Sequence, residues 1–300
     1  MISSPFMVRT VSHASQAAAT PRPGFRNGHP PRPPVGLWAM DELTARRAKS
    51  FGPVATTYDR VRPGYPPDGV SWLLEASGLL AAVAPTAGAA APRRRVLDLG
   101  AGTGALTRDL VGRGLDVVAV EPDPHMRAVL EERVPRADVR EGSAEELPLE
   151  DGAVDVVVGA QMWHWVELAA ATSEVARVLR AGGTFGLMWN LRDERVEWMA
   201  ELGSVFGGED AHRHAANVML PPGAPFTAVA ARDFRWSQEL APTDIVDLVA
   251  TRSHVQVLPD DERSAVLARV GDFVASHPAV AGRGRIVVPY VTSCWRATRT

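Results

Sequence analysis

The sequence predicts an α/β fold in which a mostly parallel sheet carries helices on both faces. Four short, mainly apolar runs have the length of strands: VLDL (96–99), VVAV (117–120), VDVVV (154–158) and TFGLMW (184–189). Helical patterns lie between them, near residues 103–113, 123–134 and 166–180. Strands that alternate with helices indicate crossover units, and continuous apolar strands indicate a sheet that is buried on both sides.

The segments that flank this alternating region have different characters. Residues 1–39 hold seven prolines, four arginines and no acidic residue. Such a segment buries too little apolar surface to offset the entropy of ordering it, so we expect a disordered tail. Towards the C-terminus, residues 208–226 are typical of a loop or insertion, and residues 242–253 and 259–277 have helical patterns. RIVVPY (285–290) predicts a strand, which TSCWRAT (292–298) follows.

The composition excludes several classes of protein. One cysteine, Cys294, allows no intrachain disulfide, and this favours a reducing compartment such as the cytoplasm. A net charge of −3 without a basic run gives no reason to expect nucleic acid as a partner. The chain has no run of about 18 apolar residues, so we expect no membrane span. His212 and His214 lie in a polar stretch without further ligand spacing, and we expect no metal site.

The glycine loop after the first strand, GAGTGA (100–105), indicates a ligand site at the end of that strand. Glycines let the backbone approach a ligand closely, and the start of the following helix offers unpaired N–H groups. Gly100, Gly102 and Gly104 form a G-x-G-x-G pattern, and the same residues satisfy the looser dinucleotide pattern G-x-G-x-x-A. The loop alone therefore leaves two classes of nucleotide ligand open.

Two acidic residues near the loop bear on the choice of ligand. Asp98 lies within the first strand, where a carboxylate repels a pyrophosphate but tolerates a ligand with a cationic amine and a sulfonium. Its alternative role is structural, as a helix cap or as a buried, hydrogen-bonded carboxylate. Glu121 ends the second strand, where an acid can accept hydrogen bonds from two ribose hydroxyls. Glu121 therefore indicates a nucleoside, and Asp98 favours a cationic one.

Four motifs in order resemble those of class I S-adenosylmethionine-dependent methyltransferases across residues 96–190. They are VLDLGAGTG (96–104), VVAVEPD (117–123), EGSAEELPL (141–149) and VDVVV followed by AQMWHW (154–165). The resemblance implies a Rossmann-like, doubly wound, mostly parallel seven-stranded sheet with helices on both faces, a C-terminal antiparallel strand and helical cap elements. It also implies S-adenosyl-L-methionine as the cofactor. YDRVRPGYP (58–66) and VVPYVTSCWRATR (287–299) extend the resemblance to a small-molecule subgroup that is similar to trans-aconitate methyltransferase.

The resemblance also assigns site residues. Those expected to bind the cofactor are Asp98, Gly100, Ala101, Gly102, Gly104, Glu121, Pro122, Ser143, Ala144, Gln161, Tyr58 and Arg62. Glu121 would hold the ribose diol. Ser143 and Ala144 would flank the adenine, although many relatives carry an acid where this chain has Ser143. Tyr58 and Arg62 would close the pocket or meet a carboxylate, and the alternative is that their segment only forms turns.

The segment QMWHW (161–165) follows the fourth strand, and ligands of open α/β sheets bind outside the carboxyl ends of strands. His164 is the candidate general base because the ordinary pKa of histidine lies near neutrality, and the alternative is a hydrogen-bonded structural residue. Trp163 and Trp165 either pack against a sulfonium and substrate or belong to the core. If the segment is extended, alternation puts both tryptophans on one side and His164 on the other.

The domain plan and the activity follow from these assignments. We expect one methyltransferase domain over residues 40–300, with the cofactor-binding core at 96–190 and cap or substrate elements at 40–80 and 190–260. The expected reaction is in-line transfer of a methyl group to an oxygen, nitrogen or carbon of a small molecule. The alternatives are an NAD(P)-dependent oxidoreductase and a non-catalytic, cofactor-binding regulator. The sequence does not decide between a monomer and a homodimer.

Overall fold

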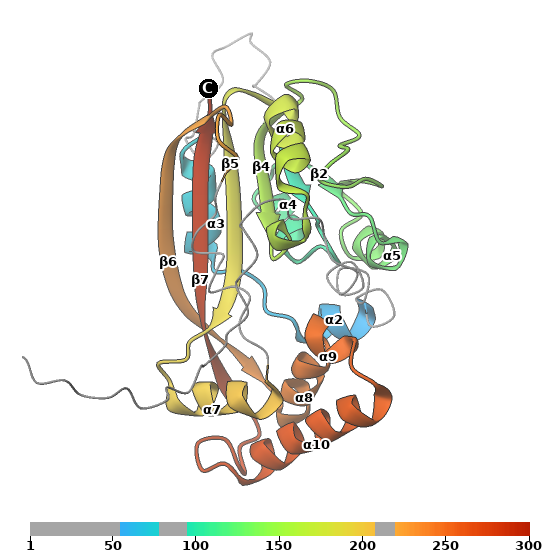
Figure 1. The fold of residues 1–300 in the computed structure, drawn as a ribbon, viewed down its shortest axis with the longest axis vertical. Helices are drawn as coiled ribbons and strands as arrows, with labels where there is room; N and C mark the ends of the chain where they lie inside the picture. Colours follow the sequence, from blue (N-terminus) through green and yellow to red (C-terminus); the bar gives the residue numbers. More distant parts are fainter. Residues whose placement is uncertain (1–54, 78–94, 208–219) are drawn as a thin grey trace, which may run out of the picture. The chain divides into compact units, whose positions relative to one another are not determined.

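The sheet of the computed structural model has the predicted α/β character. The structure describes residues 55–77, 95–207 and 220–300. Within them, seven strands form one sheet in the order β3-β2-β1-β4-β5-β7-β6 (Figure 1). The tail predicted at residues 1–39 and most of the loop predicted at 208–226 lie outside the described residues.

Five strands of this sheet run parallel to one another. They are β1 (Arg95–Leu99), β2 (Asp116–Val120), β3 (Asp138–Arg140), β4 (Val154–Ala160) and β5 (Leu179–Arg192). β1 pairs with β2 on one side and with β4 on the other, so the strand order reverses beside β1. β5 begins at Leu179, before the apolar run at 184–189, because Leu179 pairs with Val154 across an irregularity in the ladder. The reversal makes the carboxyl ends of β1 and β4 the expected ligand crevice.

The remaining two strands complete the sheet beside β5. β7 (Ile286–Arg299) pairs antiparallel with both β5 and β6 (Phe226–Leu240), which confirms the C-terminal antiparallel strand. The segments predicted separately at 285–290 and 292–298 form this single strand. The sequence analysis missed β6. It is an edge strand with one exposed face, so charged residues such as Arg232 and Asp233 interrupt the apolar pattern that marks buried strands.

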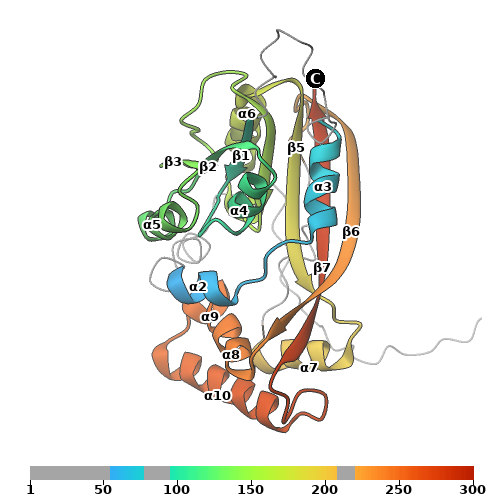
Figure 2. The same ribbon diagram turned by 180° about the vertical axis from the view of Figure 1, so that it is seen from behind.

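Helices cover both faces of the sheet because the buried side chains of each strand alternate. Val96, Val117 and Val156 pack with α3 (Pro67–Glu75) and α4 (Ala105–Gly112), which lie together on the face seen in Figure 2. Leu97 and Val118 point the other way and pack with α6 (Leu168–Val178). The predicted helix near residues 123–134 is α5 (Pro124–Arg133), and Asp123 is its N-cap, accepting from the N–H groups of residues 125 and 126.

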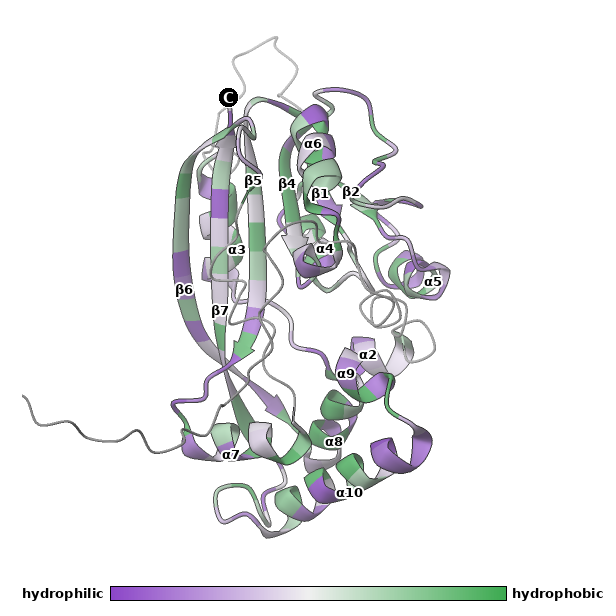
Figure 3. Ribbon diagram, viewed as in Figure 1, coloured by the Kyte–Doolittle hydropathy of each residue, from purple (hydrophilic) through white to green (hydrophobic). Residues whose placement is uncertain are grey.

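A second core lies among the helices of the cap region. α7 (Glu197–Phe206), α8 (Pro242–Ala250) and α10 (Asp260–Ser276) pack their apolar residues together with the start of β7. Hydrophilic and hydrophobic bands alternate along α10, which has one buried face (Figure 3). The short α9 (Ser253–Gln256) follows α8. Ion pairs from Arg60 to Asp244 and Asp247 join α2 (Ala55–Val61) to α8.

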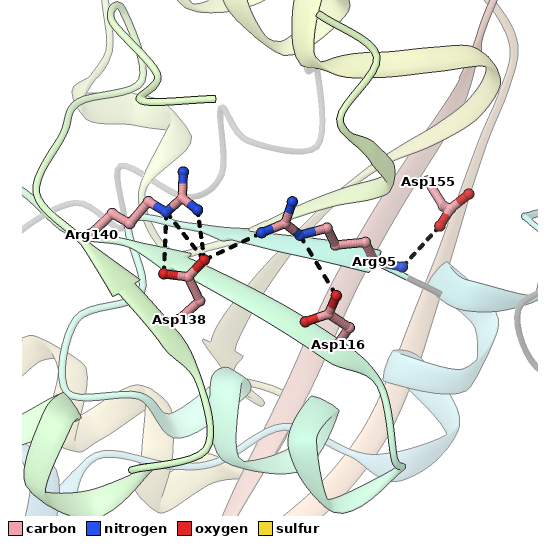
Figure 4. A network of polar contacts seen from close by, with 5 residues as sticks. All are labelled: Arg95, Asp116, Asp138, Arg140 and Asp155. Atoms are coloured by element: carbon pink, nitrogen blue, oxygen red, sulfur yellow. Dashed lines mark hydrogen bonds and ion pairs between the residues drawn. The ribbon is translucent and has the colours of Figure 1, made fainter. Parts of the chain in front are cut away.

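A charged network joins residues of four parallel strands, β1 to β4, mainly near the amino-terminal ends of the strands (Figure 4). The Arg95 guanidinium contacts Asp138 Oδ2 at 3.2 Å and Asp116 Oδ2 at 3.7 Å. Its backbone N–H donates to Asp155 at 2.8 Å. Hydrogen bonding to Arg140 lowers the pKa of Asp138 below its ordinary value. Because these groups are partly exposed, each pair contributes at most about 1 kcal/mol to stability.

The glycine at position 104 is required by packing between helices, and its replacement gives a testable effect. Gly104 has φ of 89°, and a Cβ there would lie 2.4 Å from Leu130 Cδ1 on α5. We expect Gly104→Ala to lower the free energy of unfolding by about 2–4 kcal/mol, because backbone strain and overpacking add. Urea denaturation measures the change. Gly112→Ala is the control, since a Cβ there meets no atom within 4 Å, and it should stay within about 1 kcal/mol of wild type.

Candidate functional site

The glycine loop lies at the carboxyl ends of β1 and β2 and leaves space in front of its backbone. The N–H groups of Gly100 and Ala101 donate to the carbonyl of Val120 at 2.8 and 3.1 Å, which fastens the loop to β2. A Cβ at Gly100 would lie 2.9 Å from the Met162 side chain, so only glycine fits there. At Gly102, with φ of 57°, a Cβ would meet nothing within 4 Å. Gly102 therefore borders open space where a ligand can approach the backbone.

Glu121 is held beside this space by the backbone of two elements. Its Oε2 accepts from the N–H of Gly102 at 2.9 Å, and its Oε1 accepts from the N–H of Asp123 at 2.9 Å. The residue is 7% exposed. Burial raises the pKa of Glu121, and the two backbone donors act against that rise. Each carboxylate oxygen keeps a further lone pair, so this fixed carboxylate can accept two hydrogen bonds from a ligand.

Asp98 is the most deeply buried acid of the site. It is 1% exposed, and its Oδ2 accepts from the Thr107 hydroxyl at 2.6 Å. Burial raises the pKa of Asp98 from 3.8 to about 7, although the hydrogen bond from Thr107 lowers it. The structure thus shows the hydrogen-bonded carboxylate that was one interpretation of this residue. Asp98 also lines a cavity, as the other interpretation requires.

Two adjoining cavities gather most of the predicted site residues. The larger, of about 210 Å³, is lined among others by Glu121, Pro122, Ser143, Ala144, Met126, Glu145 and Trp165. The smaller, of about 50 Å³, is lined among others by Asp98, Ala101, Arg62, Tyr65 and Asn190. Tyr58, Gly100, Gly102, Ala160 and Gln161 line both cavities. A ligand that extends through both cavities passes these five residues.

Two predicted site residues do not line either cavity. Gly104 is the N-cap residue of α4 and packs against α5, so its role in the structure is close helix packing. His164 lies in the 3₁₀ helix η2 (Trp163–Trp165) with its ring centroid 4.5 Å from that of Trp165. The helical turn replaces the extended geometry considered for this segment, because the chain bends directly after β4. Trp163 consequently enters the core, edge-on to Phe185 at 4.9 Å, while Trp165 lines the larger cavity.

Tyr58 and Arg62 reach the site from α2 and the turn that follows it. Tyr58 lines both cavities, and the Arg62 guanidinium stacks over its ring at 4.7 Å. Arg62 also donates to the Thr251 hydroxyl at 3.0 Å and to the Thr251 carbonyl at 2.7 Å. Part of the donor capacity of Arg62 therefore ties the turn to the cap, and its contact with a ligand carboxylate stays a prediction.

Several cavity residues were not identified from the sequence. Asn190 directly follows the apolar run 184–189 of β5 and lines the smaller cavity. Ligands bind at the carboxyl ends of strands, and this rule identified Gln161 after β4, so the sequence offered the same signal for Asn190. Met126, on α5, gives no sequence signal for a cavity because its spacing fits ordinary core packing.

Ser143 accepts from the N–H of Glu145 at 3.3 Å, so the residue that replaces the usual acid forms a local turn.

The described part of the chain contains neither a metal-binding cluster nor a membrane-spanning helix. No group of three or more His, Cys, Asp or Glu side chains there is arranged to hold a metal ion. No helix in residues 55–77, 95–207 or 220–300 is long and apolar enough to cross a membrane.

Comparison with known proteins identifies the family. A family model described as a methyltransferase domain matches residues 97–187. An uncharacterized methyltransferase of Mycobacterium tuberculosis strain H37Rv is 47% identical over 249 residues, which cover 83% of this chain and 95% of that protein. An uncharacterized methyltransferase-like protein of Schizosaccharomyces pombe is 30% identical over 261 residues, 84% of this chain and 96% of that protein.

A solved structure supports the fold. A protein of Anaeromyxobacter dehalogenans described as a "Putative Type II Methyltransferase" aligns with a TM-score of 0.54 at 23% identity, over 79% of this chain and 97% of that one. This likeness shows the Rossmann-like fold that the glycine loop and the strand order indicate. The placement near trans-aconitate methyltransferase stays a prediction. These relatives align over most of the chain, and the methyltransferase domain matches its core. The chain therefore belongs to the methyltransferase family and is an enzyme of the transferase class.

Proposed function

We propose that this enzyme transfers the methyl group of S-adenosyl-L-methionine to a small-molecule acceptor. The observation that carries the proposal is Glu121, whose carboxylate is fixed by the N–H groups of Gly102 and Asp123 at the wall of the larger cavity. Two acceptor oxygens with free lone pairs fit the two hydroxyls of a ribose. Ser143 and Ala144 line the same cavity, as expected for the adenine end.

Asp98 supports this cofactor over a nicotinamide dinucleotide. Its buried carboxylate lies beside the glycine loop and lines the smaller cavity. Above its pKa of about 7 Asp98 is ionised, and a pyrophosphate at the loop would then meet its negative charge in a medium of low dielectric constant, which is unfavourable. The cationic amine of the methionine part would instead stabilise the ionised form of Asp98. The chemistry of the donor set therefore fits S-adenosyl-L-methionine.

The residues of this chain act mainly by binding and orientation. When bound, the cofactor supplies a methyl group on a positively charged sulfur, which is already a good leaving group. Glu121 would hold the ribose and Asp98 the amine of the methionine part, and the backbone of the glycine loop would limit how deep the ligand lies. Holding reactants in line supplies up to about 7–11 kcal/mol of the barrier reduction. His164 as general base stays a prediction, which matters for a phenol or amine acceptor and not for a carboxylate.

Calorimetric titration with S-adenosylhomocysteine, S-adenosylmethionine and NAD⁺ tests the proposal. We expect micromolar dissociation constants for the first two and no measurable binding of NAD⁺. Binding of NAD⁺ alone would overturn the cofactor assignment. After binding is established, release of S-adenosylhomocysteine in the presence of small phenols, amines and carboxylic acids tests turnover. Tight cofactor binding with no turnover of any acceptor would favour the non-catalytic regulator.

We also infer a cytoplasmic enzyme from the single cysteine.

A further inference from the structure

Three side chains from neighbouring strands join the sheet to the turn beside the smaller cavity. On β5, Asn190 donates from Nδ2 to the carbonyl oxygen of Gly64 at 2.8 Å. The Thr292 hydroxyl, on β7, donates to Oδ1 of Asn190 at 2.6 Å. The indole N–H of Trp236, on β6, donates to the Thr292 hydroxyl oxygen at 2.7 Å. Asn190 is 3% exposed and Thr292 is 0% exposed, so water does not compete for these bonds.

The direction of each hydrogen bond in this series, which runs from Trp236 to Gly64, is fixed by the groups at its two ends. An indole N–H can only donate, and the backbone carbonyl of Gly64 can only accept. Thr292 therefore accepts from Trp236 and gives its single proton to Asn190. The Asn190 amide then has one orientation, with its oxygen towards Thr292 and its NH₂ group towards Gly64. Buried networks in which every direction is fixed hold one arrangement of their residues.

Asn190 also contacts a second residue that lines the smaller cavity, Gln161. Its backbone carbonyl accepts from Nε2 of Gln161 at 3.1 Å. Gln161 has φ of 60°, a conformation that is uncommon for residues other than glycine. Such a conformation persists only where the surrounding structure holds it, and the contact with Asn190 is one such restraint. Asn190 thus contacts both the Arg62–Tyr65 turn and the residue that lies between the two cavities.

We propose that Asn190 is a positioning residue for the methyl-transfer site and that Thr292 and Trp236 hold it in its working orientation. The proposal rests on the proposed function for the identity of the ligand. Asn190 lines the smaller cavity, whereas Thr292 and Trp236 line neither of the two cavities described above. An effect of Thr292 on ligand binding therefore passes through Asn190 and the groups that Asn190 holds.

The experiment compares two replacements of the hydroxyl that orients Asn190. Thr292→Val keeps the shape of the side chain and removes the donor, whereas Thr292→Ser keeps the hydroxyl. We expect Thr292→Val to weaken S-adenosylhomocysteine binding by about tenfold, because Asn190 loses its fixed orientation. Thr292→Ser should bind within about threefold of wild type. Calorimetry gives the affinities, and hydrogen–deuterium exchange without ligand gives the protection of residues 58–65.

A second variant tests the same arrangement from Asn190 itself. Asn190→Asp still accepts from Thr292, but its other oxygen faces the Gly64 carbonyl, so the turn is released. We expect exchange at residues 58–65 to quicken in Asn190→Asp and Thr292→Val, and to stay at the wild-type rate in Thr292→Ser. Unchanged exchange and unchanged affinity in Asn190→Asp and Thr292→Val would overturn the proposal. Uniformly faster exchange over the whole chain in these two variants would overturn it as well. If wild type binds no S-adenosylhomocysteine, the cofactor assignment fails, and the exchange measurement still decides the positioning role.

Discussion

Glu121→Ala should lose at least about 100-fold in affinity for S-adenosylhomocysteine. The carboxylate is held by the N–H groups of Gly102 and Asp123 at 2.9 Å each, and its remaining lone pairs face the larger cavity in our proposal. Two charge-assisted hydrogen bonds to a ribose contribute about 1.5–3 kcal/mol each, so their joint loss exceeds two powers of ten. Calorimetric titration measures the change directly.

Two further variants separate ligand binding from structural damage. Glu121→Gln should lose almost as much affinity for S-adenosylhomocysteine as Glu121→Ala. Its NH₂ group would face one of the two backbone N–H groups that donate to the carboxylate of Glu121. Glu132→Ala changes an exposed acid on α5 and should bind like wild type. If Glu121→Ala binds S-adenosylhomocysteine normally while it stays folded by circular dichroism, the ribose role is wrong and the site lies elsewhere.

Asp98→Asn should make the unliganded protein more stable and at the same time weaken its binding of the cofactor. Burial raises the pKa of Asp98 from 3.8 to about 7, so the folded chain holds a proton that the unfolded chain has released. The stability that this group provides is full below pH about 4 and is lost as the pH rises to about 7. The interval between the two pKa values corresponds to at most about 4 kcal/mol.

The measurement is urea denaturation of wild type and Asp98→Asn over a pH series. The advantage of the asparagine variant should grow between pH about 4 and 7 and stay constant above that range. The Thr107 hydroxyl can still donate to the asparagine oxygen, so the local packing survives. At pH about 8 the cofactor should bind more weakly to Asp98→Asn than to wild type, because its cationic amine loses its charged partner. Parallel pH curves for the two proteins would show that Asp98 is ionised normally in the folded chain.

Most of the residues that line the candidate site could be predicted because their signals are local. The glycine loop, Asp98 and Glu121 all lie at or beside the ends of apolar runs, and parallel strands bring such ends to one edge of a sheet. The loop and Glu121 then meet through a hydrogen bond between residues 19 positions apart. The N-cap role of Asp123 is local in the same sense, since a cap bonds only to the next turn of its own helix.

Other features depend on contacts between distant parts of the chain. β6 was missed because an edge strand buries one face only, and η2 could not be told from an extended segment without its neighbours. The contact of Thr292 with Asn190 joins residues 102 positions apart, and no short pattern encodes it.

The sequence by itself therefore determined the fold class and the strand ends that form the candidate site, and it predicted a nucleoside as the ligand of Glu121. Each of these depends on the order and polarity of residues within about one strand and one helix. Only the tertiary structure decided that Gly104 packs against α5, that His164 lines neither of the two cavities, and that Asn190 joins the sheet to the Arg62–Tyr65 turn. These depend on which distant side chains share one small volume, and packing fixes that only when the whole domain is folded.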